Sequence, residues 1–140
     1  MLFAFFWFCG KVIAQPKIKK SWCASLLYDI GTWKVSKANA KKFLEMMNRF
    51  VEWQKHNRKK FYYTRSTFGI VRDDDPSTET WMYVDEYKDQ ESYDKFEESF
   101  QWSNPENAGF LKLKEEFASL IVPDSYKCAR VIEKPELRIT

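Results

Sequence analysis

Several polar and aromatic side chains lie in segments that alternate like β-strands, where they could orient a small ligand. The charged members are Asp29, Arg65, Asp85 and Arg130. A carboxylate accepts hydrogen bonds or a proton, and a guanidinium binds an anionic oxygen through parallel donors. Trp81 and Tyr83 precede Asp85 in the same segment and would add aromatic surface. Together these six residues form the candidate ligand site; no residue is assigned as catalytic.

Other catalytic or metal-binding patterns are not supported by the residue types. Among the 3 cysteines, Cys23 and Cys128 have no cysteine or histidine nearby in sequence, so no zinc site is expected, and their spacing does not say whether they pair. A calcium loop beginning at Asp73 would need glycine and glutamate where Thr78 and Val84 stand. With 4 glycines the chain has no phosphate-binding loop. We therefore expect neither a metal nor a cofactor.

The elements that must position the candidate residues follow from hydropathy patterns in a chain of 140 residues, enough for one domain. Short apolar or alternating segments predict strands at 22–30, 61–71, 80–88 and 126–133. Apolar residues three or four apart predict helices over 37–57 and 105–121, the second with Asn104 as its cap, and a further helix is capped by Asp89. This β-α-β-β-α-α-β order predicts an α+β, ferredoxin-like sandwich whose antiparallel sheet has the order 4-1-3-2, with the helices on one face.

The chain divides into a leader with a basic linker (1–21), one ferredoxin-like domain (22–134) and a tail (135–140). Met1–Cys9 is entirely apolar, but it is shorter than the roughly 20 residues needed to span a bilayer, so no stable transmembrane span is expected. The residues that follow fit signal-peptidase cleavage after Ala14, which would imply export to the periplasm or outside the cell. The alternatives are a misassigned start or an apolar arm packed on the domain, with a cytoplasmic location.

Charge is divided unevenly along the chain. Residues 17–72 hold 14 lysines and arginines against 3 acidic residues, whereas residues 73–140 hold 8 against 17. One interpretation is a basic face for nucleic acid or anionic lipid. The other is that the two halves pack side by side and neutralise one another. RNA-recognition domains share the element order, but the third strand here is acidic and lacks glycine, so nucleic-acid binding is not favoured.

The alternation within the strands also predicts which side chains leave the helix-covered face. Met82 and Val84 are assigned to the helix side, and Trp81, Tyr83 and Tyr87 to the open side. The four charged candidates are placed on the same open side as the aromatic residues. So much aromatic surface is rarely left in water. We therefore predict a homodimer that buries this open face, with room for a small apolar or aromatic ligand.

The segment TWMYVDEYKDQESYDKFEESF, residues 80–100, takes a strand directly into an aromatic-rich helix. With the element order and the extra helix at 105–121, it resembles the dimeric α+β barrel superfamily, which includes the antibiotic-biosynthesis monooxygenase group. The resemblance is one of topology and covers about residues 22–134. It implies that two open sheet faces meet in a barrel. It also implies that a small apolar substrate binds inside the barrel or between sheet and helices.

The resemblance has consequences for individual residues. Haem-degrading members use a helical histidine, but His56 ends a basic helix and is expected to be solvated, so haem is not expected. Cofactor-independent members use a tryptophan, polar side chains and an activated substrate. The resemblance makes Trp81 the counterpart of that tryptophan, and Arg65, Asp85 and Arg130 could orient an acidic phenol or an enolate. The implied function is a small-molecule-binding protein, monooxygenase-like if it is an enzyme, that acts on an aromatic or enolic substrate.

Two alternatives remain open at this point. In a non-catalytic dimer with a filled barrel, Arg65 would pair with Asp85 or Glu86, and Trp81 and Tyr83 would be interface core. In the second alternative the domain binds nucleic acid.

Overall fold

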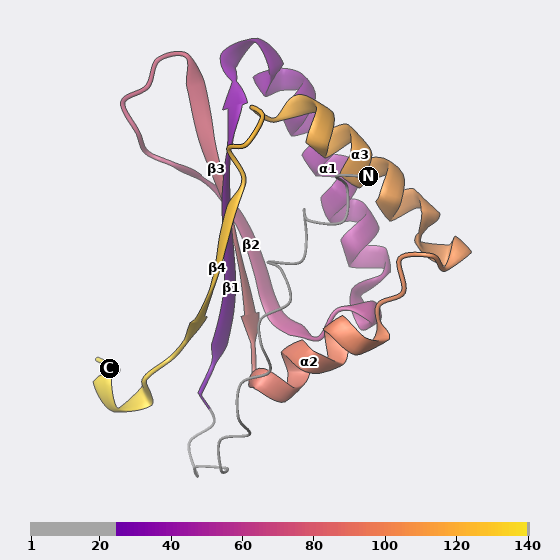
Figure 1. Ribbon diagram of the computed structural model, residues 1–140, viewed down its shortest axis with the longest axis vertical. Helices are drawn as coiled ribbons and strands as arrows, with labels where there is room; N and C mark the ends of the chain where they lie inside the picture. The colour runs from indigo at the N-terminus through magenta and orange to yellow at the C-terminus, as the bar shows by residue number, and fades with distance from the viewer. Residues whose placement is uncertain (1–24, 140) are drawn as a thin grey trace.

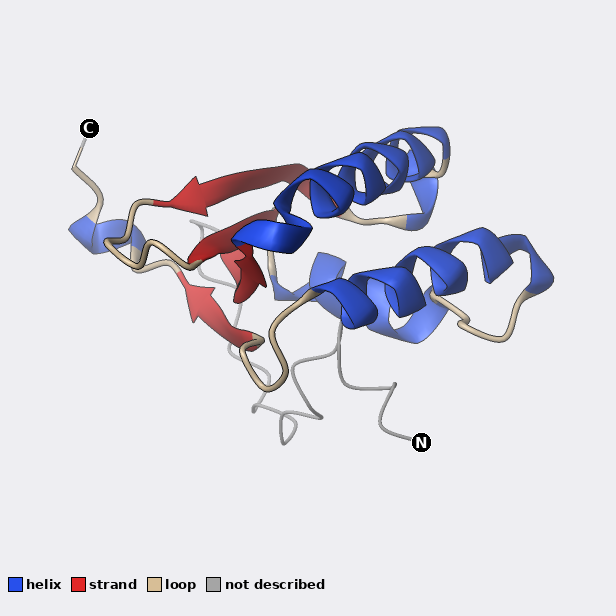
Figure 2. Cartoon of the chain, turned by 90° about the horizontal axis from the view of Figure 1, so that it is seen from above, coloured by secondary structure: helices blue, strands red, loops and turns tan. Residues whose placement is uncertain are grey.

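The fold is known from a computed structural model that describes residues 25–139. Its antiparallel sheet contains β1 (Leu27–Ser36), β2 (Tyr63–Val71), β3 (Thr78–Tyr87) and β4 (Lys127–Ile132). The strand order β2-β3-β1-β4 is the predicted one. One face of the sheet is covered by α1 (Ala40–His56), α2 (Gln90–Ser99) and α3 (Ala108–Leu120), as Figures 1 and 2 show. The predicted fold class is thus confirmed.

The predicted leader and linker, residues 1–21, lie outside the described residues. From residue 25 to residue 139, no helix is long and apolar enough to cross a membrane. Cys128 on β4 is disulfide-bonded, and the other cysteines, Cys9 and Cys23, precede the described range.

Two sequence-predicted helix caps are present. The Asp89 carboxylate accepts a hydrogen bond of 2.8 Å from the backbone N–H of Ser92 at the start of α2. Asn104 accepts one of 3.0 Å from the backbone N–H of Glu106, and Pro105 follows at the first position of the 3-10 turn Pro105–Asn107 that leads into α3. These side chains satisfy backbone donors that have no partner inside the helix.

The first strand differs from its prediction, which ended it before Gly31. It continues to Ser36, with Gly31 in its interior opposite Tyr83. The glycine therefore marks a close approach between backbone and ring rather than a turn.

The prediction of which strand residues face the helices was wrong by one position. Trp81, Tyr83 and Tyr87 are buried beneath the helices. The Trp81 ring lies 5.1 Å from that of Phe43 on α1, and the Tyr87 ring 5.1 Å from that of Tyr93 on α2. Both alternating sets of β3 contain large apolar side chains, so hydropathy alone did not distinguish them. The helices bury the larger aromatic set because it removes more apolar surface from water.

The open face of the sheet is correspondingly aliphatic rather than aromatic. Ile30 pairs with Val84 on one side and Ala129 on the other, and Tyr28 pairs with Val131. Val131 is 45% exposed. We call the side chains of Tyr28, Ile30, Met82, Val84 and Val131 the open-face cluster. Figure 1 shows all three labelled helices on the opposite side of the sheet.

The uneven charge distribution is partly neutralised inside the domain. Arg49 on α1 forms an ion pair with Glu116 on α3, and Lys60 lies 3.5 Å from Glu106. Both pairs join the basic first half to the acidic second half, in keeping with the side-by-side interpretation.

Candidate functional site

Two buried carboxylates lie directly opposite one another in the sheet. Asp29 on β1 and Asp85 on β3 are register partners, and both face the helices with 5% and 7% of their surface exposed. Side chains directly opposite in antiparallel strands have Cβ atoms about 4.5–5.5 Å apart. The two acids therefore form a pair beneath the helices, whereas the sequence interpretation had placed them on the open face.

Each carboxylate is held by a hydroxyl group. Tyr83 donates a hydrogen bond of 3.2 Å to Asp29 Oδ2, and the Tyr126 hydroxyl donates one of 3.2 Å to the Tyr83 hydroxyl. Ser66 on β2 donates a hydrogen bond of 2.5 Å to Asp85 Oδ1. These bonds fix the orientation of both acids.

The protonation of the pair is shifted by its environment. Burial raises the pKa of Asp29 to about 6, against the opposing effects of the Tyr83 hydrogen bond and the Arg130 charge. Burial also raises the pKa of Asp85 to about 7, and the charge of Asp29 adds to this shift while the Ser66 hydrogen bond opposes it. Desolvation disfavours the charged form of a carboxyl group, and two adjacent carboxylates disfavour each other's ionisation. The pair thus exchanges protons near neutral pH.

A cavity of about 20 Å³ adjoins the acid pair. Gln54 on α1 also lines it, and this side chain is 7% exposed. The rest of the lining is aromatic: Phe61, Tyr87, Phe96, Trp102 and Phe110. A space of this size holds one water molecule or one polar group of a ligand. We call this space the inner cavity.

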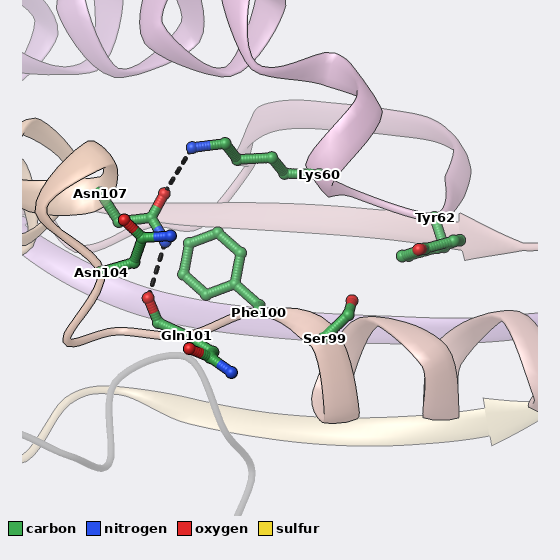
Figure 3. Close-up of a pocket in the computed structure, with 7 residues that line it drawn as sticks. All are labelled: Lys60, Tyr62, Ser99, Phe100, Gln101, Asn104 and Asn107. Atoms are coloured by element: carbon green, nitrogen blue, oxygen red, sulfur yellow. Dashed lines mark hydrogen bonds between the residues drawn. The ribbon is translucent and has the colours of Figure 1, made fainter.

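A larger hollow of about 230 Å³ lies near the end of α2. Figure 3 shows the residues that line it: Lys60, Tyr62, Ser99, Phe100, Gln101, Asn104 and Asn107. Lys60 Nζ donates a hydrogen bond of 2.8 Å to Asn107 Oδ1, and Asn107 Nδ2 donates one of 2.7 Å to the Gln101 carbonyl. This outer hollow is therefore polar and held by its own hydrogen bonds.

Phe100 contacts the linings of both spaces. Its ring lines the outer hollow (Figure 3), and it lies 5.6 Å from the rings of both Phe61 and Phe110, which line the inner cavity.

Four of the six predicted site residues come together beneath the helices: Asp29, Tyr83, Asp85 and Arg130. The Arg130 side chain lies 3.8 Å from Glu97 and 5.1 Å from the Tyr93 ring. The other two predicted residues lie elsewhere. Arg65 pairs in register with Glu86 on the open face, and Trp81 packs on Phe43 and donates a hydrogen bond to Glu79.

The sequence interpretation missed Gln54, Tyr126 and the aromatic lining of the inner cavity. Gln54 carried a usable signal, because it continues the three- and four-residue steps of Phe43, Met47 and Phe50 along the buried face of α1. A polar residue in such a stripe indicates a polar environment inside the fold. Tyr126 carried no comparable signal.

The described residues suggest no metal centre, since no group of three or more His, Cys, Asp or Glu side chains among them is placed to hold an ion. His56 is exposed at the end of α1, and its Nδ1 lies 2.7 Å from the carbonyl of Glu52. The three consecutive aspartates are exposed in the β2–β3 connection, where Asp75 accepts a hydrogen bond from Ser77.

Comparison with known proteins identifies the fold. No known family and no curated protein matches the sequence. Among solved structures, a variant of SnoaB, a cofactor-independent oxygenase from Streptomyces nogalater, matches with a TM-score of 0.54 and 16% identity over 81% of this chain and 98% of that one. A dimeric ferredoxin-like protein from an uncultured marine organism matches with a TM-score of 0.54 and 14% identity over 78% and 95% of the two chains.

A third similar structure contains a ligand. It is a monooxygenase from the gene ActVA-Orf6 of Streptomyces coelicolor in complex with Nanaomycin D, with a TM-score of 0.51 and 13% identity over 83% of this chain and 94% of that one. The chain therefore has the ferredoxin-like α+β fold shared by antibiotic biosynthesis monooxygenase-like and dimeric ferredoxin-like proteins. Identities this low show the fold alone.

Proposed function

We propose that the protein binds a small hydroxylated aromatic or enolic molecule between its sheet and helices and acts on it as a cofactor-independent monooxygenase. One observation carries this proposal: the buried Asp29–Asp85 pair faces a cavity that Gln54 also lines and that is otherwise aromatic. Ligand sites typically combine apolar walls with a few placed polar groups. The described activity of SnoaB and of the Streptomyces coelicolor protein is in keeping with this function.

The chemistry requires no cofactor if the substrate supplies the electrons. In such a monooxygenation one atom of O₂ enters the substrate, and the other leaves as water with two hydrogen atoms taken from the substrate. The protein would bind the substrate, orient its hydroxyl group and exclude bulk water. Tyr83 would position Asp29, and Arg130 would supply positive charge close to the same acid.

The substrate would reach the inner cavity through the outer hollow. An inner cavity of about 20 Å³ admits one polar group but not an aromatic ring. Displacement of Phe100 would join it to the outer hollow of about 230 Å³, where Lys60 and Asn104 would contact the polar end of the ligand.

The test uses the purified full-length protein and hydroxylated aromatic probes. We expect 2-naphthol to bind with one site per chain in isothermal titration calorimetry. We also expect a naphthalenediol to be oxidised with uptake of O₂ faster than in buffer containing heat-denatured protein. Failure of both measurements would argue against the proposed function.

We further propose that two copies associate through the open-face cluster. The cluster is apolar, and its centre lies over the paired residues Ile30 and Val84. Exposed apolar surface of this kind commonly marks an interface. A neighbour of the same fold is described as a dimeric ferredoxin-like protein, which supports a second copy of this chain as the occupant.

A non-catalytic dimer is the second candidate function. It is favoured by the dense aromatic packing between sheet and helices, where the inner cavity measures about 20 Å³. The two candidates differ in one measurement, because a purely structural dimer would bind neither naphthol nor naphthalene while remaining dimeric in solution.

A further inference from the structure

We propose that the disulfide of Cys128 on β4 joins it to Cys9, and that this bond holds the apolar residues 1–8 against the helix side of the sheet, where they cover the candidate site. Cys128 is disulfide-bonded, and the other cysteines of the chain, Cys9 and Cys23, both precede residue 25. The effect on ligand access rests on the proposed function, whereas the pairing and the packing of residues 1–8 do not.

The chain before β1 leaves Cys23 at or beyond the limit of reach. Gly31 on β1 is the register partner of Cys128, and the carbonyl of Leu26 accepts a backbone hydrogen bond of 2.9 Å at the end of the same ladder. The five residues from Leu26 to Gly31 rise about 17 Å. Cys23 precedes Leu26 by three residues, which span at most about 11 Å. A disulfide joins Cα atoms no more than about 7 Å apart, so Cys23 would have to double straight back over the sheet at full extension.

Cys9 is not limited in this way. It precedes Leu26 by 17 residues, and a chain of that length can span more than about 50 Å. It therefore reaches Cys128 without being stretched. Forming the bond removes two electrons and two protons from the two thiols, and an oxidant of the disulfide-exchange type accepts them. Such bonds are typical of proteins that fold in an oxidising compartment.

The Cys128 side chain points toward the helices. Side chains two residues apart in a strand share a face, and both such neighbours of Cys128 contact helices. The Tyr126 ring lies 6.4 Å from that of Phe117 on α3, and the Arg130 guanidinium lies 5.1 Å from the ring of Tyr93 on α2. Cys128 is half-buried between them. The disulfide therefore brings its partner segment to the helix side of the sheet, between α2 and α3.

This position adjoins the candidate site. Asp29, which lines the inner cavity, is the register partner of Arg130, and Arg130 lies about 7 Å along β4 from Cys128. Residues 1–8 are all apolar, and 5 of them are aromatic. Such a segment gains free energy by leaving water and packing on other aromatic rings. The lining of the inner cavity offers those rings within reach, since eight extended residues span about 26 Å.

The pairing also bears on the predicted leader. Cleavage after Ala14 would cut the chain between Cys9 and β1, so that only the disulfide would hold residues 1–9 to the domain. The proposal therefore agrees with the packed-arm alternative, in which these residues remain part of the mature chain.

Peptide mapping without reduction tests the pairing. The full-length protein is produced in a host with an oxidising cytoplasm, its free thiols are alkylated, and trypsin then cuts after lysine and arginine. Cys9 is released in residues 1–11, Cys23 in residues 21–34 and Cys128 in residues 128–130. We expect mass spectrometry to find 1–11 joined to 128–130, with Cys23 alkylated. Any other partner of 128–130, including a second copy of itself, would overturn the pairing, as would alkylation of Cys128.

Hydrogen exchange tests the packing of residues 1–8. Cys9→Ser removes the proposed bond, and Cys23→Ser is the matched control. We expect the amides of residues 1–8 to exchange about tenfold more slowly in the wild type and in Cys23→Ser than in Cys9→Ser, because the disulfide restricts the detached states of the segment. Equally fast exchange in all three proteins would overturn the packing even if the peptide map shows the bond.

Binding of 2-naphthol tests whether the segment covers the site. We expect association in stopped-flow fluorescence to be about tenfold faster in Cys9→Ser than in the wild type or Cys23→Ser, in proportion to the lost restriction. Binding at one rate in all three proteins would overturn the cover.

These measurements separate this inference from the proposed function. If 2-naphthol binds neither the wild type nor Cys9→Ser, the proposed function fails, and the peptide map and the exchange rates still decide the disulfide and the packing. The map needs only the wild-type protein, so misfolding of a variant would leave the pairing testable.

Discussion

Gly31 and Tyr83 are register partners on β1 and β3, and the Tyr83 ring occupies the space that a side chain on residue 31 would need. A Cβ atom at Gly31 would lie 2.2 Å from Tyr83 Cε1. With the ring in this position, the Tyr83 hydroxyl reaches Asp29 Oδ2 at 3.2 Å. The glycine therefore permits the hydrogen bond that orients one acid of the candidate site.

Replacing this glycine should damage both packing and the site. We expect Gly31→Ala to lower the free energy of unfolding by about 1–3 kcal/mol, because the added methyl overpacks the core, and to weaken naphthol binding as Tyr83 moves from Asp29. Urea unfolding and calorimetry would measure these effects. Gly69→Ala is the matched control, since nothing lies within 4 Å of its Cβ position. Equal effects of the two substitutions would contradict the prediction.

The acid pair predicts how stability depends on pH. Burial raises the pKa of Asp29 to about 6 and that of Asp85 to about 7, from the ordinary aspartate value of 3.8 that applies to the unfolded chain. Between pH 4 and 7 the folded state therefore holds more protons than the unfolded state. It follows that the contribution of these acids to stability is greatest at low pH and is lost as the pH rises through 6 and 7.

Urea unfolding at pH 5 and pH 8 would test this dependence. From pH 5 to pH 8 we expect the free energy of unfolding to fall in both proteins. The fall should be about 1–3 kcal/mol smaller in Asp85→Asn than in the wild type, because the group that releases the proton is absent. The exposed Asp94→Asn variant should behave like the wild type. The predicted sign is wrong if the wild-type free energy of unfolding instead rises from pH 5 to pH 8 and Asp85→Asn removes that rise.

The proposed dimer predicts the effect of a charge in the open-face cluster. Val84→Asp should convert the dimer to a monomer, because burying an unpaired carboxylate at an interface is strongly unfavourable. Size-exclusion chromatography with light scattering would report the mass. Leu44→Asp, a similar change at a residue that is 49% exposed on α1, should leave the dimer intact. A wild-type protein that is monomeric at all concentrations would rule out this association.

The wall between the two spaces predicts a kinetic effect. Phe100→Leu should make association of 2-naphthol faster in stopped-flow fluorescence, because a smaller side chain separates the outer hollow from the inner cavity. We expect this variant to lose about 1–3 kcal/mol of stability through lost ring contacts. Tyr62→Leu is the control, since Tyr62 lines the outer hollow but not the inner cavity and is 41% exposed. If neither variant changes the rate, ligand reaches the site by another route.

Local sequence signals were sufficient for the element order and for several helix ends. Asp89 and Asn104 were identified as caps because capping depends on a side chain and the backbone two or three residues away. The strand order followed from the element order, since few connections are compatible with it. The end of β1 was placed too early because Gly31 was interpreted as a boundary, whereas its role depends on Tyr83, which lies far along the chain.

The chemistry-bearing residues were partly identified from the sequence, but their arrangement was not. Asp29, Tyr83, Asp85 and Arg130 were singled out by type, yet placed on the wrong face, because both alternating sets of β3 contain large apolar side chains. Trp81 and Arg65 were included although they lie away from the cavity. Gln54 and Tyr126 were missed, since each becomes part of the site only through packing of α1 and of the segment before β4 against the sheet.

By itself, the amino-acid sequence determined the fold class, the order of the strands and the types of side chain that could bind a ligand, because propensity, capping and hydropathy act over a few residues. Only the tertiary structure decided that Asp29 and Asp85 lie opposite each other beneath the helices with Gln54 above them. That arrangement depends on which face of each strand the helices bury, and this choice is made by the packing of large aromatic side chains from distant parts of the chain.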